Sequence, residues 1–118
     1  MKKILIVDDE EYNRDILLKV LVKESYEVIE AEDGMFALDA VRKNQFDLIL
    51  LDIMMPRMDG FEFLEVIQKQ MKKKIPIIVT TALNRDNFTN QFTVEAYFNK
   101  PFRIVDIIQK IKEVLHDS

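Results

Sequence analysis

Four stretches of the sequence place polar side chains at the end of an aliphatic run. An acidic triplet at 8–10 follows the first run, Asp52 ends the second, Thr81 ends the third, and Lys100 follows a shorter fourth. Carboxylates, a hydroxyl and an ammonium group in one small space could hold a hard divalent cation together with an anionic group. This chemistry requires that the elements carrying the four stretches bring their ends together.

The aliphatic runs are typical of the strands of a parallel sheet. Three runs rich in Ile, Leu and Val are nearly continuous, as in strands buried on both faces: 3–8, 47–52 and 75–81. The segment 26–31 alternates with acids, which favours an edge strand, and 95–100 is a fifth, shorter candidate. The sequence therefore predicts five strands.

Amphipathic segments separate these strands. Apolar residues recur at helical spacing in four segments: 10–24, 34–43, 60–72 and the last segment from Ile104 to Leu115. Three lysines at 72–74 fall where a helix should end, and the favoured interpretation is a solvated end that complements the helix dipole. Strands alternating with about five helices predict a doubly wound α/β fold with right-handed crossovers. Ligands of such folds bind at the carboxyl ends of the strands, where the polar residues fall.

The carboxylates expected at the ends of these strands determine what the site could bind. Neighbouring carboxylates repel one another, so a stable ionised cluster needs a cation. With oxygen donors and no His or Cys nearby, the expected metal is Mg²⁺, followed by Mn²⁺ or Ca²⁺. A phosphoryl group could then lie near Asp52, with Lys100 supplying a point charge and Thr81 a hydrogen bond. Taken singly, each residue could instead be a helix cap or a turn residue.

Composition narrows the class of protein. The chain has 118 residues, 48% of them hydrophobic and 32% charged, which predicts one globular domain covering 1–118. Its net charge of −4 argues against direct nucleic-acid binding, and the lack of cysteine excludes disulfides and thiol chemistry. The first apolar run stops at Asp8, too short for a signal peptide, and no run approaches the ~18 residues of a membrane span. We expect a cytoplasmic protein without membrane contact.

Four motifs in this order resemble the receiver domain of bacterial two-component response regulators, over the whole chain. They are IVDDEE after the first strand, LLDIMMPRMDG around Asp52, IPIIVTTA at the end of the fourth strand, and YFNKPF before the last helix. The resemblance implies a flavodoxin-like sheet with strand order 2-1-3-4-5. It also implies that Asp52 is a phosphoacceptor, taking its phosphoryl group from a histidine kinase or a histidine phosphotransfer protein.

The resemblance assigns further roles. Asp9 and Asp52 would bind Mg²⁺ directly, with the backbone carbonyl of Met54, and Asp8 would act mainly through water. Thr81 and Lys100 would contact the phosphoryl oxygens. Tyr97 matches the aromatic position whose rotamer changes with phosphorylation, so Thr81 and Tyr97 would form the switch. The docking surface for the phosphodonor would consist of Tyr12, Asn13, Arg14 and Ile16.

The match departs from the family between Thr81 and Lys100. This span is shorter than usual by roughly three residues, close to one helical turn. The residues there are weak helix formers, so we expect the fourth helix to be short, distorted or mobile. Phe88 and Phe92 would either fill the core in place of the lost turn or form an exposed partner patch. The usual surface for downstream partners is therefore in question.

The leading hypothesis is a phosphorylation switch that changes its surface for an unknown downstream target, with intrinsic self-dephosphorylation influenced by Met54 and Leu83. The chain shows no output domain, although one could lie outside it. The main alternative is a small Mg²⁺-dependent phosphohydrolase with Asp52 as nucleophile. It is disfavoured because haloacid-dehalogenase-type enzymes use a second Asp two residues after the nucleophile, and here that position is Met54. A flavin or nucleotide binder is a third possibility, but the chain lacks the glycine-rich motif that such proteins carry after the first strand. An unphosphorylated scaffold is disfavoured because every residue that the phosphoryl chemistry needs is present.

Overall fold

A computed structural model of the chain describes residues 1–82 and 92–117. Its strands are β1 (Lys3–Val7), β2 (Glu27–Ala31), β3 (Leu48–Asp52), β4 (Ile77–Thr81) and β5 (Ala96–Asn99). Its α-helices in these ranges are α1 (Glu11–Lys23), α2 (Gly34–Lys43), α3 (Gly60–Leu64) and α4 (Ile104–Leu115), and a π-helix, η1 (Glu65–Gln70), continues α3.

The five strands form one sheet in the order β2-β1-β3-β4-β5, and every neighbouring pair is parallel. This confirms the predicted doubly wound α/β fold and its 2-1-3-4-5 order. The most aliphatic strand, β3, is buried at all of its residues in the centre of the sheet. The acids of β2 are exposed at one edge, as the alternating pattern predicted.

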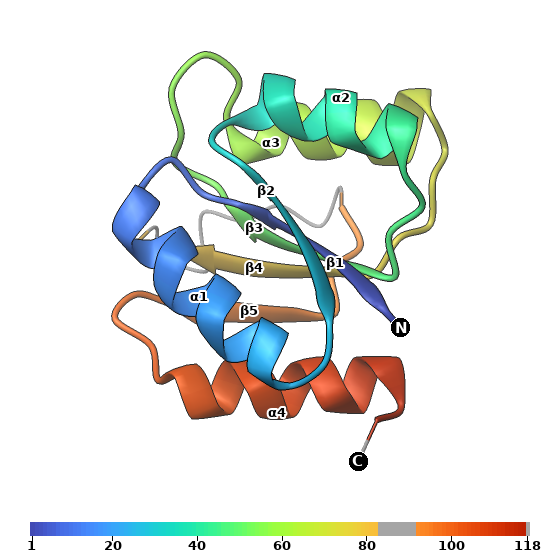
Figure 1. Cartoon of the computed structure of the whole chain (residues 1–118). Coiled ribbons are helices and arrows are strands. Elements are labelled where there is room, and N and C mark those ends of the chain that lie inside the picture. The colour runs from blue at the N-terminus through green and yellow to red at the C-terminus, as the bar shows by residue number, and fades with distance from the viewer. Residues whose placement is uncertain (83–91, 118) are drawn as a thin grey trace.

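Helices cover both faces of the sheet (Figure 1). On one face, α2 and α3 enclose a core built from alternate strand residues such as Leu5, Leu51 and Val79. On the other face, α1 and α4 enclose a second core that includes Ile6 and Ile78. Each strand therefore contributes side chains to both cores, which explains the continuous apolar runs.

Local signals set most helix boundaries. Asp33 caps α2 by accepting a hydrogen bond from the Phe36 N–H at 3.0 Å. Asp59 and Glu62 form a reciprocal capping box at the start of α3. His116, in a left-handed conformation, ends α4.

The expected helices over 60–72 and between Thr81 and Lys100 have different outcomes. The single helix expected over 60–72 is wrong in detail, because its α-helical part ends at Leu64 and the chain continues as a π-helix to Gln70. Apolar spacing cannot distinguish the two, since both bury one face. The short fourth helix expected between Thr81 and Lys100, and the placement of Leu83 and Phe88, fall at 83–91, outside the described residues. Among the described helices, none is long and apolar enough to span a membrane.

Candidate functional site

The carboxyl ends of β1, β3, β4 and β5 deliver the polar residues that the sequence singled out. Asp52 is the last residue of β3, and Asp8 directly follows the neighbouring β1. Thr81 ends β4, and its carbonyl accepts a hydrogen bond from the Lys100 N–H at 2.8 Å. This bond extends the pairing of β4 with β5 by one step and fixes where Lys100 leaves the sheet.

Lys100 links the carboxylates at the ends of β1 and β3. Its Nζ lies 3.1 Å from Asp52 Oδ2, to which it donates a hydrogen bond, and 3.5 Å from Asp8 Oδ2. Asp8 and Asp52 are each only 3% exposed. The second oxygen of each carboxylate accepts a backbone hydrogen bond: Asp52 from the Met54 N–H at 3.2 Å, and Asp8 from the Glu10 N–H at 2.9 Å.

Burial makes Asp52 an unusual acid. Removal from water, followed by the nearby Asp8 carboxylate, raises the pKa of Asp52 to about 6, and Lys100 only partly opposes these effects. Burial also raises the pKa of Asp8, against a hydrogen bond from Glu10 and the charge of Lys100. Burial by itself would lower the pKa of Lys100, but Asp52 and Asp8 together raise it. The site therefore holds more negative charge than its single lysine offsets.

The acidic residues after β1 have the chemistry of a hard-cation site. One carboxylate oxygen from each of Asp8, Asp9 and Glu10 lies within 4.8 Å of the others. A hollow of about 390 Å³ adjoins this group and is lined by Asp9, Met54, Met55 and neighbouring loop residues. The oxygen-only donor set fits Mg²⁺, which takes carboxylates and keeps several waters. The structure joins Asp52 to this group through Lys100 rather than through a shared oxygen cluster.

The two residues expected to act as a switch lie on neighbouring strands. Thr81 is fully buried at the end of β4. Tyr97, in β5, is half-buried and packs against the core beneath α2 and α3. Val79 lies opposite Tyr97 in the β4–β5 register, two residues before Thr81 on the same strand. Thr81 and Tyr97 therefore lie on neighbouring strands and on the same face of the sheet.

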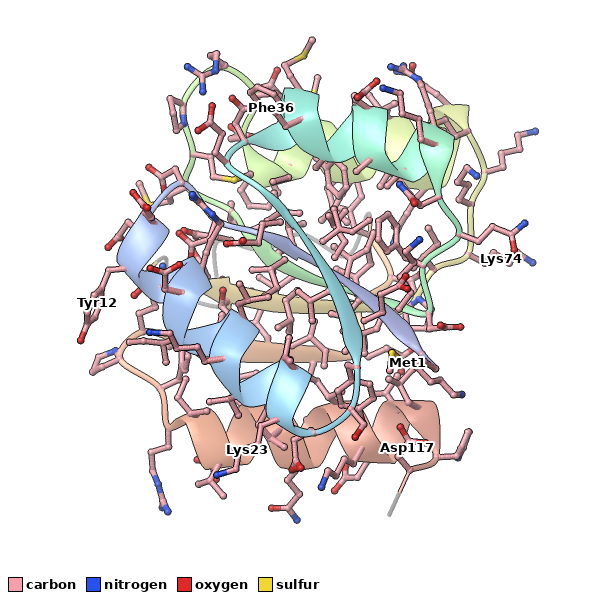
Figure 2. The ribbon with its side chains drawn as sticks, in the orientation of Figure 1. Met1, Tyr12, Lys23, Phe36, Lys74 and Asp117 are labelled. Atoms are coloured by element: carbon pink, nitrogen blue, oxygen red, sulfur yellow. The ribbon has the colours of Figure 1, made fainter. Side chains whose placement is uncertain are left out.

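The expected docking residues lie on the first turns of α1. Tyr12 is 74% exposed and projects away from the molecule (Figure 2). Asn13 and Ile16 are half-buried. Arg14 is directed inward: its guanidinium donates to the Asp8 carbonyl at 2.7 Å and pairs with Glu30 at 3.3 Å. Much of the hydrogen-bonding capacity of Arg14 is thus committed to the corner between β1 and β2.

A latch between two loops beside the site was not predicted from the sequence. The buried Asp33 carboxylate accepts a hydrogen bond from Arg57 Nε, and Arg57 also pairs with Glu32 at 3.3 Å. The Gly34 N–H donates to the Met58 carbonyl at 3.2 Å, and a Cβ on Gly34 would lie 2.6 Å from Met58 Cγ. These contacts fasten the loop after β3 to the start of α2. An Asp directly before a helical segment is a cap signal, but nothing in the sequence points to its partner 24 residues away.

The buried Asp52 carboxyl, the bridging Lys100 and the acidic group after β1 lie together at the carboxyl ends of the strands, where ligands of doubly wound folds bind. The family model described as "Response regulator receiver domain" matches residues 4–112. The chain belongs to this family, whose members are signalling domains of two-component systems.

Curated relatives fall into two groups by length. The chain is 38% identical over 117 residues to sporulation initiation phosphotransferase F of Bacillus subtilis, covering 97% of this chain and 94% of the relative. It is 35% identical to the response regulator GtcR of Aneurinibacillus migulanus over 97% of this chain but 48% of the relative. The chain therefore spans about half the length of some relatives and nearly all of others.

Solved structures agree with the fold. The response regulator TrrA of Thermotoga maritima, solved in complex with Mg²⁺-BeF, is 35% identical with a TM-score of 0.85, covering 97% of this chain and 99% of that one. The chemotaxis protein CheY4 of Vibrio cholerae is 31% identical with a TM-score of 0.86, covering 97% and 98%. This chain therefore covers nearly the whole length of both solved chains.

Proposed function

We propose that residues 1–118 form a receiver domain that accepts a phosphoryl group on Asp52 in a Mg²⁺-dependent reaction. The observation that carries the proposal is the geometry of Asp52: a buried strand-end carboxylate, 3.1 Å from the Lys100 ammonium and next to an acidic group of Mg²⁺-type donors. The Mg²⁺-BeF complex of the similar TrrA supports the choice of metal.

The proposed reaction is a transfer between two nucleophiles. A carboxylate oxygen of Asp52 attacks phosphorus, the phosphorus–nitrogen bond of the phosphohistidine donor breaks, and the imidazole leaves with the electron pair and takes up a proton. Mg²⁺, held by Asp9, Asp52 and the Met54 carbonyl with Asp8 acting through water, would supply charge neutralisation and orientation. Lys100 offsets charge on the phosphoryl oxygens, and the Thr81 hydroxyl donates a hydrogen bond to one of them.

Phosphorylation would act as a local change of charge with a wider effect. It adds roughly −1.5 to −2 charges to a pocket that is already acidic. Movement of Thr81 toward the phosphoryl group would free space for the half-buried Tyr97 and so change the surface near β5. The donor would be a histidine kinase or a histidine phosphotransfer protein, docked on Tyr12, Asn13, Arg14 and Ile16. The similarity to a sporulation phosphotransferase favours a place in a phosphorelay.

The test is phosphorylation by a small donor. The protein is incubated with acetyl phosphate or phosphoramidate and Mg²⁺, and its intact mass is followed over time. We expect the gain of one phosphoryl group, its abolition by EDTA or by Asp52→Asn, and its retention in the exposed control Asp39→Asn. Slow loss after removal of the donor would reveal self-dephosphorylation.

Two results would contradict the proposal. If no donor gives a mass gain, the chain is not an active receiver. If inorganic phosphate is released continuously from aryl phosphates in an Asp52-dependent reaction, the phosphohydrolase alternative holds instead.

A further inference from the structure

A second concave site lies at the amino-terminal ends of β4 and β5, at the opposite edge of the sheet from Asp52. Its volume is about 750 Å³, within the range of about 300–1,000 Å³ found for small-molecule sites. Ile77, the first residue of β4, lines this pocket, whereas Thr81 at the other end of the same strand belongs to the acidic site. Figure 2 shows Lys74, another lining residue, and Tyr12 on opposite sides of the molecule.

The π-helix builds one wall of this pocket. The wide turns of η1 end at Gln70, and Lys72 adopts a left-handed conformation with φ of 54° before the chain enters β4. Gln68 fixes the opposite wall, because its side chain donates to the Thr93 carbonyl at 2.7 Å and accepts from the Thr93 N–H at 3.1 Å. Both bonds use the backbone of Thr93, a lining residue of the pocket whose side chain is exposed.

The charge around the pocket is opposite to that of the chain as a whole. The net charge of the chain is −4, yet Lys69, Lys72, Lys73 and Lys74 all line this pocket beside one carboxylate, Glu95. Lys69 pairs with Glu65 at 3.5 Å. Within residues 1–82 and 92–117, the three lysines at 72–74 form no ion pair. The pocket therefore carries an excess of positive charge over its one carboxylate.

The floor of the pocket is apolar. Ile77 is buried, and Ile75 and Pro76, which also line the pocket, are half-buried. Lysine stems can extend this apolar surface while their ammonium groups stay in water at the rim. Apolar lining residues next to several lysines match a ligand with an apolar body and an acidic end.

From this arrangement we propose that the pocket binds a small organic anion with an apolar body, carrying a carboxylate, sulfonate or phosphate group. The apolar body would lie on Ile75, Pro76 and Ile77, and the anionic group would face Lys72 and Lys74. A small molecule is favoured over a flat protein partner because the surface is concave and its volume matches a compact ligand. The site is independent of the proposed phosphorylation, since it shares no residue with the acidic cluster.

The test uses 1-anilinonaphthalene-8-sulfonate, a fluorescent anion with an apolar body, and unphosphorylated protein in EDTA. We expect one binding site, amide shifts in NMR spectra confined mainly to 68–77 and 93–95, and weaker binding at high salt. Lys72→Glu combined with Lys74→Glu should weaken binding about tenfold, since two attractive charges become repulsive. The control pair Lys19→Glu and Lys23→Glu makes the same change of net charge on α1 and should change affinity by less than about twofold.

Two further arms separate the pocket from general dye binding. Thr93→Phe adds a ring at a lining position of the pocket and should also weaken binding, with thermal unfolding verifying that the variant folds. Asp52→Asn should bind the dye as the parent does, so failure of the proposed phosphorylation would not affect this result. The proposal is overturned if the dye does not bind, if its shifts map elsewhere, if both lysine pairs weaken binding equally, or if only anionic lipid vesicles bind.

Discussion

At the scale of single residues, Asp52 combines two properties that conflict in a folded protein. It is buried, which favours the neutral acid, and it lies beside Asp8, which opposes a second negative charge. Lys100 contacts both carboxylates and balances one charge but not two. The metal-free protein therefore keeps an energetically costly carboxylate at neutral pH. A neutral side chain at this position would make the folded protein more stable. The acid is therefore best explained by a role in the proposed phosphoryl chemistry.

Asp52→Asn should stabilise the metal-free protein at neutral pH. The folded protein releases the proton of Asp52 near pH 6, whereas an unfolded chain releases it near 3.8. Between these values the folded state binds more protons, so the stability associated with protonated Asp52 is full below 3.8 and is lost as the pH rises through 6. The substitution removes that loss, and we expect a gain of about 1–3 kcal/mol at pH 7.5 that nearly vanishes at pH 4.

Urea unfolding in EDTA at pH 4, 5, 6 and 7.5 measures this difference. Asp39→Asn is the matched control, because Asp39 is exposed on α2 and forms only a surface pair with Lys43. Its unfolding free energy should stay within about 0.5 kcal/mol of the parent at each pH. A gain for Asp52→Asn that is independent of pH would show that desolvation of the carboxylate is not the cause.

At the scale of elements, residues from both ends of the α3–η1 segment hold the chain that leads into β5. The Phe92 ring stacks on Phe61 with centroids 6.4 Å apart, and Lys69 Nζ lies 5.1 Å from the Phe92 centroid. Gln68 adds two hydrogen bonds to Thr93. Of the two interpretations of Phe92 in the sequence, the structure supports the one in which it fills the core, because the ring is half-buried against the cluster under α2 and α3.

Phe92→Ala should destabilise the protein by about 1–3 kcal/mol, less than for a fully buried phenylalanine, because only part of the ring leaves an apolar environment. The control is Phe36→Ala on α2, whose ring is 54% exposed, with an expected loss below about 1 kcal/mol. Urea unfolding of both variants gives the comparison. Equal losses for the two would mean that Phe92 does not act as a core residue.

How far the sequence could predict these elements depends on the range of the interactions. The strands were predictable because continuous apolar runs report burial on both faces, and the polar strand ends followed from the parallel topology. The π-helical turns of η1 were not predictable, since α- and π-helical turns bury similar residues. The Arg57–Asp33 latch was also hidden, because its partners lie 24 residues apart and their meeting depends on the packing of α2 beside α3. Strand order came from family resemblance, not from periodicity.

At the scale of the whole molecule, charge is distributed between the two ends of the strands. Asp8, Asp9 and Asp52 collect at the carboxyl edge, and the lysines at 72–74 collect at the amino edge. The two hydrophobic cores lie between these edges on either face of the sheet. The proposed Mg²⁺ and phosphoryl site therefore lies at one end of the strands, and the proposed anion site lies at the other. A ligand at either edge should change the stability of the whole domain, because it binds only the folded arrangement.

Mg²⁺ should therefore raise the melting temperature of the whole domain, and EDTA should reverse the change. A cation at the acidic edge offsets the repulsion between Asp8, Asp9 and Asp52, and binding at ten times Kd would contribute about 1.4 kcal/mol. For a domain of this size that corresponds to a rise of roughly 3–8 °C. Differential scanning calorimetry at constant ionic strength, with NaCl replacing MgCl₂ in the reference, measures the rise. Asp9→Asn should remove most of it and Asp39→Asn should keep it; the same rise in both variants would place the metal away from the carboxyl ends of the strands.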